Sequence, residues 1–182
     1  MKNYFKQLPG FTLIELLIVI GILGVLAATI VATLDPFEQV RKSRDSALRD
    51  ASNEFLNASV RYFIGKDVLP WYSVANGGSN CYTGGNTLSS IALSSLTTCM
   101  QTLVTDGELK QGFLNSSNLS LMFVTNPNPQ TSNASDVIVC FLPQSKTQQK
   151  DSQTKYTQGG VTQTAGTCKS QGGSTSCYWC TQ

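Results

Sequence analysis

The stretch LPGFTLIE at residues 8–15 opens an apolar run that continues to Leu34 without another charged residue. From Leu16 to Leu34 the run has about the 20 residues that a membrane-spanning helix needs. Glu15 places one carboxylate at the mouth of this helix, where an ionisable side chain is costly and by default indicates a function that involves a partner. The sequence therefore predicts a membrane-length helix with one functional carboxylate near its start.

Three simpler interpretations of the N-terminal segment fit less well. A secretory signal peptide has a basic start and an apolar region of about 7–15 residues before a small-residue cleavage site. Lys2 and Lys6 supply the basic start and residues 30–32 resemble a cleavage site, but the apolar region is too long. A plain transmembrane anchor meets the length requirement and gives Glu15 no role. A buried helix of a soluble domain is seldom apolar on every face.

The N-terminus resembles that of type IV prepilins: a short leader with lysines ends in Gly10, and Phe-Thr-Leu-Ile-Glu follows at residues 11–15. The resemblance covers about the first 40 residues. It implies that a prepilin peptidase removes the leader, residues 1–10, and that Phe11 becomes an N-methylated N-terminus. Gly10 suits this cleavage because a residue without a side chain lets a protease approach the backbone closely.

The resemblance also implies an assembly role for Phe11 and Glu15 within residues 11–34, the hydrophobic transmembrane and polymerisation helix. In this family the new ammonium group pairs with the glutamate of a neighbouring subunit, and the pair sets the axial register. Removing one partner of a buried ion pair typically costs about 3–5 kcal/mol. Small residues within the helix let neighbouring helices approach closely; these are Gly21, Gly24, Ala27 and Ala28.

For function, the resemblance implies a structural subunit of a type IV pilus filament and not an enzyme. The expected partners are further copies and other pilins, the prepilin peptidase, and the pilus assembly platform and motor. The subunit waits in the cytoplasmic (inner) membrane and then joins an extracellular pilus on the cell surface, with roles in adhesion, motility or DNA uptake. A pseudopilin of a type II secretion or competence system is one alternative. A non-polymerising membrane-anchored adhesin or DNA-binding module is another.

The composition argues against catalysis, metal binding and nucleic acid as a partner. Lys and Arg number 13 against 11 acids, which gives a net charge of +2 and no basic scaffold. The absence of histidine removes the usual general base and the commonest zinc ligand. Cys177 and Cys180 form a C-x-x-C pair, but a zinc site usually needs two such pairs, and no helix follows to lower a thiol pKa. We expect no catalytic residue, metal or cofactor.

Six cysteines lie beyond the apolar helix, in the part expected to be exported: Cys81, Cys99, Cys140, Cys168, Cys177 and Cys180. An even count in a small exported region predicts disulfides, with 15 possible connectivities for six cysteines. We favour Cys81–Cys99, because these residues flank one loop and helix. The other four are expected to pair near the C-terminus, with Cys140 joined to Cys168, Cys177 or Cys180.

Residues 35–66 are predicted to form an amphipathic helix. Asp35 can cap a new helix with Pro36 at its first position, or Pro36 can kink one continuous helix; we expect a nearly continuous helix with a bend at Pro36. Asp45 is placed to pair with Arg41 and Arg49 at i, i+4 spacing. Apolar residues recur at three- and four-residue steps; they are Phe37, Val40, Leu48, Ala51, Phe55, Ala58 and Tyr62.

Residues 67–182 are rich in polar residues and are predicted to form the exported globular head. Apolar spacing predicts a short helix within residues 87–105 and strands at 119–125 and 136–142, with weaker strands at 154–164 and 175–180. The aromatic residues Trp71, Tyr72, Tyr178 and Trp179 can contact an external ligand, although core packing is the commoner role. The predicted fold class is α+β: a long N-terminal helix, half membrane-spanning and half amphipathic, packed on a small antiparallel sheet stapled by disulfides.

Overall fold

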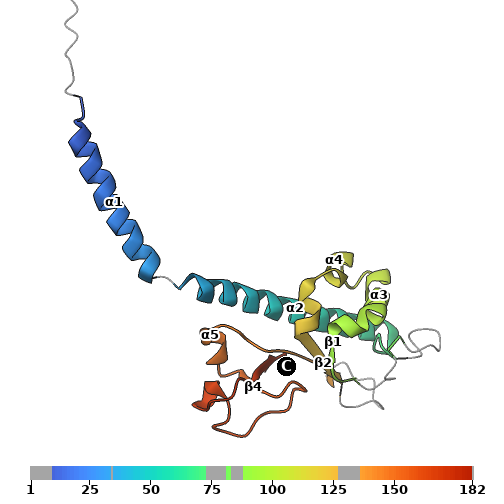
Figure 1. Cartoon of the computed structure of the whole chain (residues 1–182). Helices are drawn as coiled ribbons and strands as arrows, with labels where there is room; N and C mark the ends of the chain where they lie inside the picture. The colour runs from blue at the N-terminus through green and yellow to red at the C-terminus, as the bar shows by residue number, and fades with distance from the viewer. Residues whose placement is uncertain (1–9, 34, 73–80, 83–87, 127–135, 182) are drawn as a thin grey trace, which may run out of the picture. The chain divides into compact units, whose positions relative to one another are not determined.

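A computed structural model describes residues 10–33, 35–72, 81–82, 88–126 and 136–181 of the chain (Figure 1). The chain divides into two units, Met1–Phe37 and Glu38–Gln182, and each is described by itself. The first unit contains the apolar helix. The second contains the amphipathic helix together with the sheet, so the amphipathic helix is part of the compact head.

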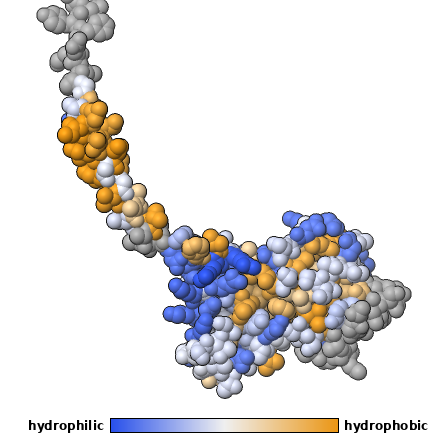
Figure 2. Space-filling view, in the orientation of Figure 1, coloured by the Kyte–Doolittle hydropathy of each residue, from blue (hydrophilic) through white to orange (hydrophobic). Residues whose placement is uncertain are grey.

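The apolar helix α1 spans Leu13–Thr33. Its segment Leu13–Val31 is 19 residues long, is apolar enough to cross a membrane, and has no buried residue. At 1.5 Å per residue this segment extends about 29 Å, which matches a hydrocarbon core of about 30 Å. Figure 2 shows that the visible side of α1 is largely apolar.

The amphipathic helix α2 spans Pro36–Lys66 and begins at the proline. Asp35 lies outside both helices, so two helices replace the nearly continuous helix that we expected. The physical reason is that proline has no N–H to donate to the preceding turn and disfavours helical geometry at the residue before it. A bend at Pro36 stays a prediction.

The predicted apolar stripe of α2 packs against the head from Leu48 onward, where Leu48, Phe55, Ala58 and Tyr62 are buried. The first two members of the stripe, Phe37 and Val40, are instead 75% and 68% exposed. The helix is therefore amphipathic with respect to the head only over its later turns.

Asp45 interrupts the apolar stripe and is nevertheless buried, with 2% of its surface exposed. Its carboxylate accepts hydrogen bonds from the backbone N–H of Gln144 at 3.0 Å and of Ser145 at 2.7 Å. It forms neither of the predicted ion pairs with Arg41 and Arg49 among the described residues. Because Ser145 precedes helix α5 (Lys146–Gln149), Asp45 fixes the start of α5 against α2.

The head contains a five-stranded antiparallel sheet in the order β1-β2-β3-β5-β4. The strands are β1 (Leu88–Ala92), β2 (Met122–Asn126), β3 (Ile138–Phe141), β4 (Thr154–Tyr156) and β5 (Tyr178–Cys180). The short helices are η2 (Leu93–Leu96), α3 (Thr97–Thr105), α4 (Gln111–Leu114), η3 (Ser117–Leu121) and η5 (Lys169–Gln171). The four predicted strands are confirmed but shorter, with β2 ending one residue beyond its predicted range, and the α+β class is confirmed.

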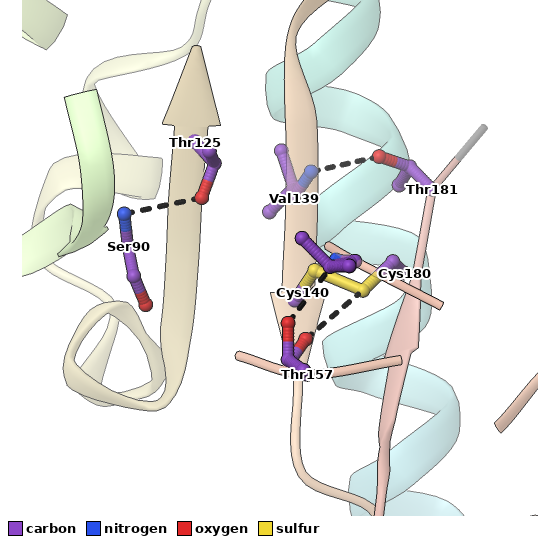
Figure 3. The surroundings of a disulfide bond; sticks show 8 residues. Ser90, Thr125, Val139, Cys140, Thr157, Cys180 and Thr181 are labelled. Atoms are coloured by element: carbon purple, nitrogen blue, oxygen red, sulfur yellow. Dashed lines mark hydrogen bonds between the residues drawn. A yellow bond between two sulfur atoms is a disulfide. The ribbon is translucent and has the colours of Figure 1, made fainter. Parts of the chain in front are cut away.

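The predicted helix within residues 87–105 is wrong in its first part, because Leu88–Ala92 forms strand β1. Leu88 lies opposite Asn126 and Ile91 lies opposite Val124, so two residues three apart occupy the same face of the sheet. A β-bulge explains this spacing: Ser90 has φ of 57°, and its N–H donates to the Thr125 hydroxyl oxygen at 3.1 Å (Figure 3). The extra residue gives a strand the three-residue spacing that is typical of a helix. The helix begins later, at Thr97.

Aromatic side chains form much of the core between α2 and the sheet. Phe55 stacks with both Trp71 and Phe113, with ring centroids 6.4 Å apart in each pair. Trp179 packs against Phe141 and lies 4.8 Å from the Arg49 guanidinium carbon. Trp71, Tyr72 and Trp179 are buried, so core packing is confirmed for these three, and Tyr178 is half-buried.

All six cysteines form disulfides, as predicted: Cys81–Cys99, Cys140–Cys180 and Cys168–Cys177. The first is the pair that the sequence favoured. Cys140 and Cys180 lie directly opposite each other on β3 and β5. Beyond them Thr181 continues the pairing, since its N–H donates to the Val139 carbonyl and its hydroxyl oxygen accepts from the Val139 N–H, both at 2.9 Å (Figure 3).

Candidate processing and assembly site

The Gly10–Phe11 junction lies before α1, outside helical structure. Gly10 is exposed, and no atom lies within 4 Å of the position that a side-chain Cβ would occupy. The Phe11 side chain is 81% exposed. The backbone around the predicted cleavage point is therefore open to a protease. The leader residues before Gly10 lie outside the described part of the chain.

Thr12 and Glu15 form a reciprocal capping box at the start of α1. The Glu15 N–H donates to the Thr12 hydroxyl oxygen at 3.3 Å. The Thr12 N–H and the Thr12 hydroxyl both donate to Glu15 Oε2 at 2.8 Å. This arrangement satisfies donors at the first turn that have no partner within the helix. In a helix that enters lipid these hydrogen bonds are strongly stabilising, because no water is present to satisfy the first-turn donors instead.

Thr12 is a residue that the sequence reasoning missed. The signal was available, because Thr-Leu-Ile-Glu matches the T-x-x-E capping pattern immediately before an apolar run. Glu15 was assigned only a role between subunits. The structure adds a role within the chain, in which Thr12 fixes the direction of the Glu15 side chain.

The capping box leaves one oxygen of Glu15 available. Every hydrogen bond that Glu15 accepts within the described chain uses Oε2, so Oε1 can receive another donor. The structure does not bring the Phe11 nitrogen and Glu15 into contact. The expected ammonium arises only after cleavage, and its partner is expected on another subunit. The Phe11–Glu15 pair stays a prediction.

The remainder of α1 offers a surface suited to close helix packing. Gly21 and Gly24 have no atom within 4 Å of an added Cβ, so a neighbouring backbone can approach there. The only polar side chain in the second half of α1 up to Val31 is Thr29, whose hydroxyl donates to the Leu26 carbonyl at 2.8 Å. This bond removes an unsatisfied donor from the apolar surface.

The head shows no arrangement suited to metal or redox chemistry among its described residues. No group of three potential metal ligands occurs in that part of the chain. The two cysteines of the C-x-x-C pair are bonded to other partners, Cys177 to Cys168 and Cys180 to Cys140. The C-x-x-C segment is thus part of the structural framework.

The clearest charged cluster of the head, at the end of α2, is also structural. Arg61 Nε lies 2.7 Å from Glu108 Oε2, and Lys66 Nζ lies 3.4 Å from Asp106 Oδ2. Burial, followed by the Asp106 charge, raises the pKa of the adjacent Tyr62. These ion pairs join α2 to the loop between α3 and α4.

Comparison with known protein families finds the prokaryotic N-terminal methylation motif at residues 9–31. The match begins at the residue before Gly10 and ends at Val31, where the membrane-length segment of α1 ends. No curated protein and no solved structure matches the chain.

This motif is the type IV prepilin-like signature, so the predicted resemblance is confirmed. The motif is typical of a family of structural proteins, and the apolar helix that it covers is long and apolar enough to cross a membrane. The particular class that they support is the type IV pilin-like and pseudopilin proteins, whose members assemble with other pilins.

Proposed function

We propose that the chain is a structural subunit of a type IV pilus filament. A prepilin peptidase cuts between Gly10 and Phe11, the new N-terminus is methylated, and the subunit leaves the cytoplasmic membrane as its α1 helix joins the filament core. The observation that carries the proposal is α1 itself: an apolar helix with no buried residue and a single carboxylate, Glu15, at its start.

An apolar helix without a polar face needs an apolar environment on every side. Lipid supplies this environment to a single subunit, and the α1 helices of neighbouring subunits supply it in a filament. Transfer between the two environments costs little, because lipid tails and apolar side chains solvate the helix similarly. The membrane stage and the filament stage thus use the same surface.

The Glu15 carboxylate determines how neighbouring subunits are aligned along the filament axis. Cleavage after Gly10 leaves the Phe11–Thr12 amide intact, so the Thr12 N–H that caps Glu15 is present before and after processing. Glu15 Oε1 can then accept the Phe11 ammonium of a neighbouring subunit. An ammonium entering an apolar bundle without a counter-charge is strongly disfavoured. This pairing sets the axial register between neighbouring subunits.

Intact-mass analysis of purified surface filaments tests the proposal. We expect a chain that begins at Phe11, carries the mass of one methyl group, and lacks six hydrogens because of the three disulfides. Recovery of the protein only in membranes, with the leader retained, would refute filament assembly. Recovery only in a short periplasmic fibre that depends on a secretion system would instead support the pseudopilin alternative.

A substitution of Glu15 tests the alignment mechanism separately. Glu15→Gln keeps the side-chain shape and removes the charge, so we expect normal membrane insertion and severely reduced incorporation beside wild-type subunits. Ile14→Leu, one residue earlier on the same helix, is the matched control and should incorporate normally. Equal incorporation of both variants would contradict the charge-pair mechanism.

A further inference from the structure

A groove opens on the head beside helix α2, and we call it the apolar groove. Its volume is about 230 Å³, below the range of about 300–1,000 Å³ that is usual for small-molecule sites. Among the described residues no charged side chain lines it, and its two polar lining residues, Ser120 and Gln144, are exposed. Its apolar lining comes from segments far apart in the sequence: Leu48, Leu121, Phe123, Leu142 and Tyr178.

The apolar groove is formed within the head of a single chain. Leu48 is buried against the head, with 2% of its surface exposed. The rings of Phe123 and Tyr178 meet edge to face, with centroids 6.1 Å apart, and both residues are half-buried. Leu142 is 41% exposed and is the most open of the apolar lining residues. The groove therefore offers a preformed apolar surface that an apolar side chain of a partner can cover.

The start of α2 carries apolar side chains that the head leaves uncovered. Phe37 and Val40 belong to the apolar stripe of α2, and both are largely exposed. Residues three positions apart lie side by side on a helix, so the two side chains form one surface, which we call the apolar pair. Aromatic side chains are the usual anchors of protein interfaces, which makes Phe37 the principal member of the pair.

The apolar pair does not fill the apolar groove of its own chain. Neither Phe37 nor Val40 lines that groove. Along α2 they precede Leu48 by eleven and eight residues, which corresponds to about 16 Å and 12 Å at 1.5 Å per residue. A continuous helix keeps these distances fixed, so the groove of one chain can receive the pair only from another chain.

A contact between two different surfaces of the same chain is heterologous. Each copy offers its apolar groove to one neighbour and its apolar pair to another, and such contacts generate rings or open filaments. In copies whose α2 helices are parallel, the spacing of about 12–16 Å between pair and groove displaces each copy along the helix direction. A displacement that repeats at every contact gives an open filament and not a closed ring.

The position of the apolar pair in the chain indicates that the partner is a second copy. Phe37 comes four residues after Thr33, the last residue of α1, so it lies within about 14 Å of the end of that helix. In the proposed function α1 packs against the α1 helices of other copies. The apolar pair therefore continues the surface through which copies are expected to meet.

We propose that the apolar groove of one subunit binds Phe37 of a second copy, with Val40 at the rim of the groove. The contact fixes the head of one subunit against the start of α2 of its neighbour. It adds a specific contact outside the membrane-length helix to the assembly through α1. This inference deepens the proposed function and rests on it.

Photocrosslinking in assembled filaments tests the contact. Phe37 is replaced in the full chain by p-benzoylphenylalanine, a photoreactive residue that keeps an aromatic ring, and the variant is expressed beside wild-type subunits. Sheared filaments are irradiated, dimers are isolated on a denaturing gel, and the linked peptides are identified by mass spectrometry. We expect position 37 of one copy to be linked to Phe123, Leu142 or Tyr178 of another. The matched control is Ile64, which is as exposed as Phe37 and lies near the other end of α2; the same replacement there should give no links to the apolar groove.

Substitutions on both sides of the contact give a second readout. Leu142→Gln places a polar side chain in the apolar groove and should reduce the links from position 37 about fivefold. Val161→Gln, at another exposed apolar residue of the head, should leave them unchanged. Phe37→Ser should lower the amount of the variant in sheared filaments about fivefold, whereas Ile64→Ser should not lower it.

The outcomes distinguish failure of this contact from failure of the proposed function. If filaments form and position 37 is linked only to lipid or to residues outside the apolar groove, the contact is wrong and the proposed function stands. Equal linking to the groove from positions 37 and 64 would also overturn the contact. If the wild-type chain forms no filaments, the proposed function fails and the contact fails with it.

Discussion

Replacing Asp45 by Ala is expected to destabilise the head by about 2–4 kcal/mol, although Asp45 lies on a helix rich in exposed charges. The carboxylate holds two backbone donors of the segment before α5, and one of them, the Ser145 N–H, is buried. Hydrogen bonds to a charged group contribute about 1.5–3 kcal/mol each, and a buried donor left without a partner costs about 1–3 kcal/mol. The Gln144 N–H is partly buried and regains some hydration, which keeps the total below the sum of two full bonds.

Two further variants serve as references for this loss of stability. Asp45→Asn keeps one accepting oxygen, so we expect a loss of about 1–3 kcal/mol. Asp50→Ala is the matched control on the same helix, because Asp50 is exposed and makes no hydrogen bond or ion pair among the described residues; we expect a change within about 0.5 kcal/mol.

Urea unfolding of the full chain in detergent micelles measures these differences. Trp71 and Trp179 are both buried in the head, so their fluorescence reports unfolding of the head and not of α1. The midpoint and slope of each transition give the free energy of unfolding. If Asp45→Ala and Asp50→Ala differ by less than about 0.5 kcal/mol, then the backbone contacts of Asp45 contribute nothing measurable and our reasoning is wrong.

Two other predictions concern the capping box and the disulfides. Thr12→Val removes the capping hydroxyl, a change that costs about 0.5–2 kcal/mol in similar caps. We expect it to lower the amount of subunit in sheared filaments, whereas Thr12→Ser, which keeps the hydroxyl, should give the wild-type amount. Equal yields from the two variants would argue against the cap. Removing the Cys140–Cys180 bond by a double change to Ala should destabilise the head by about 4 kcal/mol, and removing the Cys168–Cys177 bond in the same way by about 2.6 kcal/mol. The reason is that the unfolded chain gains more entropy when the disulfide that closes the loop of 40 residues is lost than when the one that closes the loop of 9 residues is lost. Urea unfolding checks the order, and a larger loss from the shorter loop would contradict it.

The features that sequence predicts well here are those with a strong local signal. The run from Leu13 to Val31 predicts α1 by length and composition alone. Alternation or clustering of apolar residues locates four of the five strands, but their ends depend on pairing across the sheet, so each of these four is shorter than predicted. The reciprocal bond between Thr12 and Glu15 was also readable in the sequence, because both residues lie in one turn.

Features that depend on distant segments could not be predicted in this way. Asp45 turns inward because of backbone donors about 100 positions away, while the local pattern predicts ion pairs along the helix. Leu88 and Ile91 share a face through a bulge that pairing with β2 stabilises, while their spacing predicts a helix. In both cases a contact made only in the folded head outweighs a weak local preference.

The place of β5 has a consequence for biogenesis. This strand comes after all the others in the chain, yet it pairs with β3 on one side and β4 on the other. In the proposed export, the polypeptide must therefore be translocated as far as residue 180 before β4 can join the rest of the sheet. Until then Cys140 on β3 has no disulfide partner, because Cys180 lies on β5.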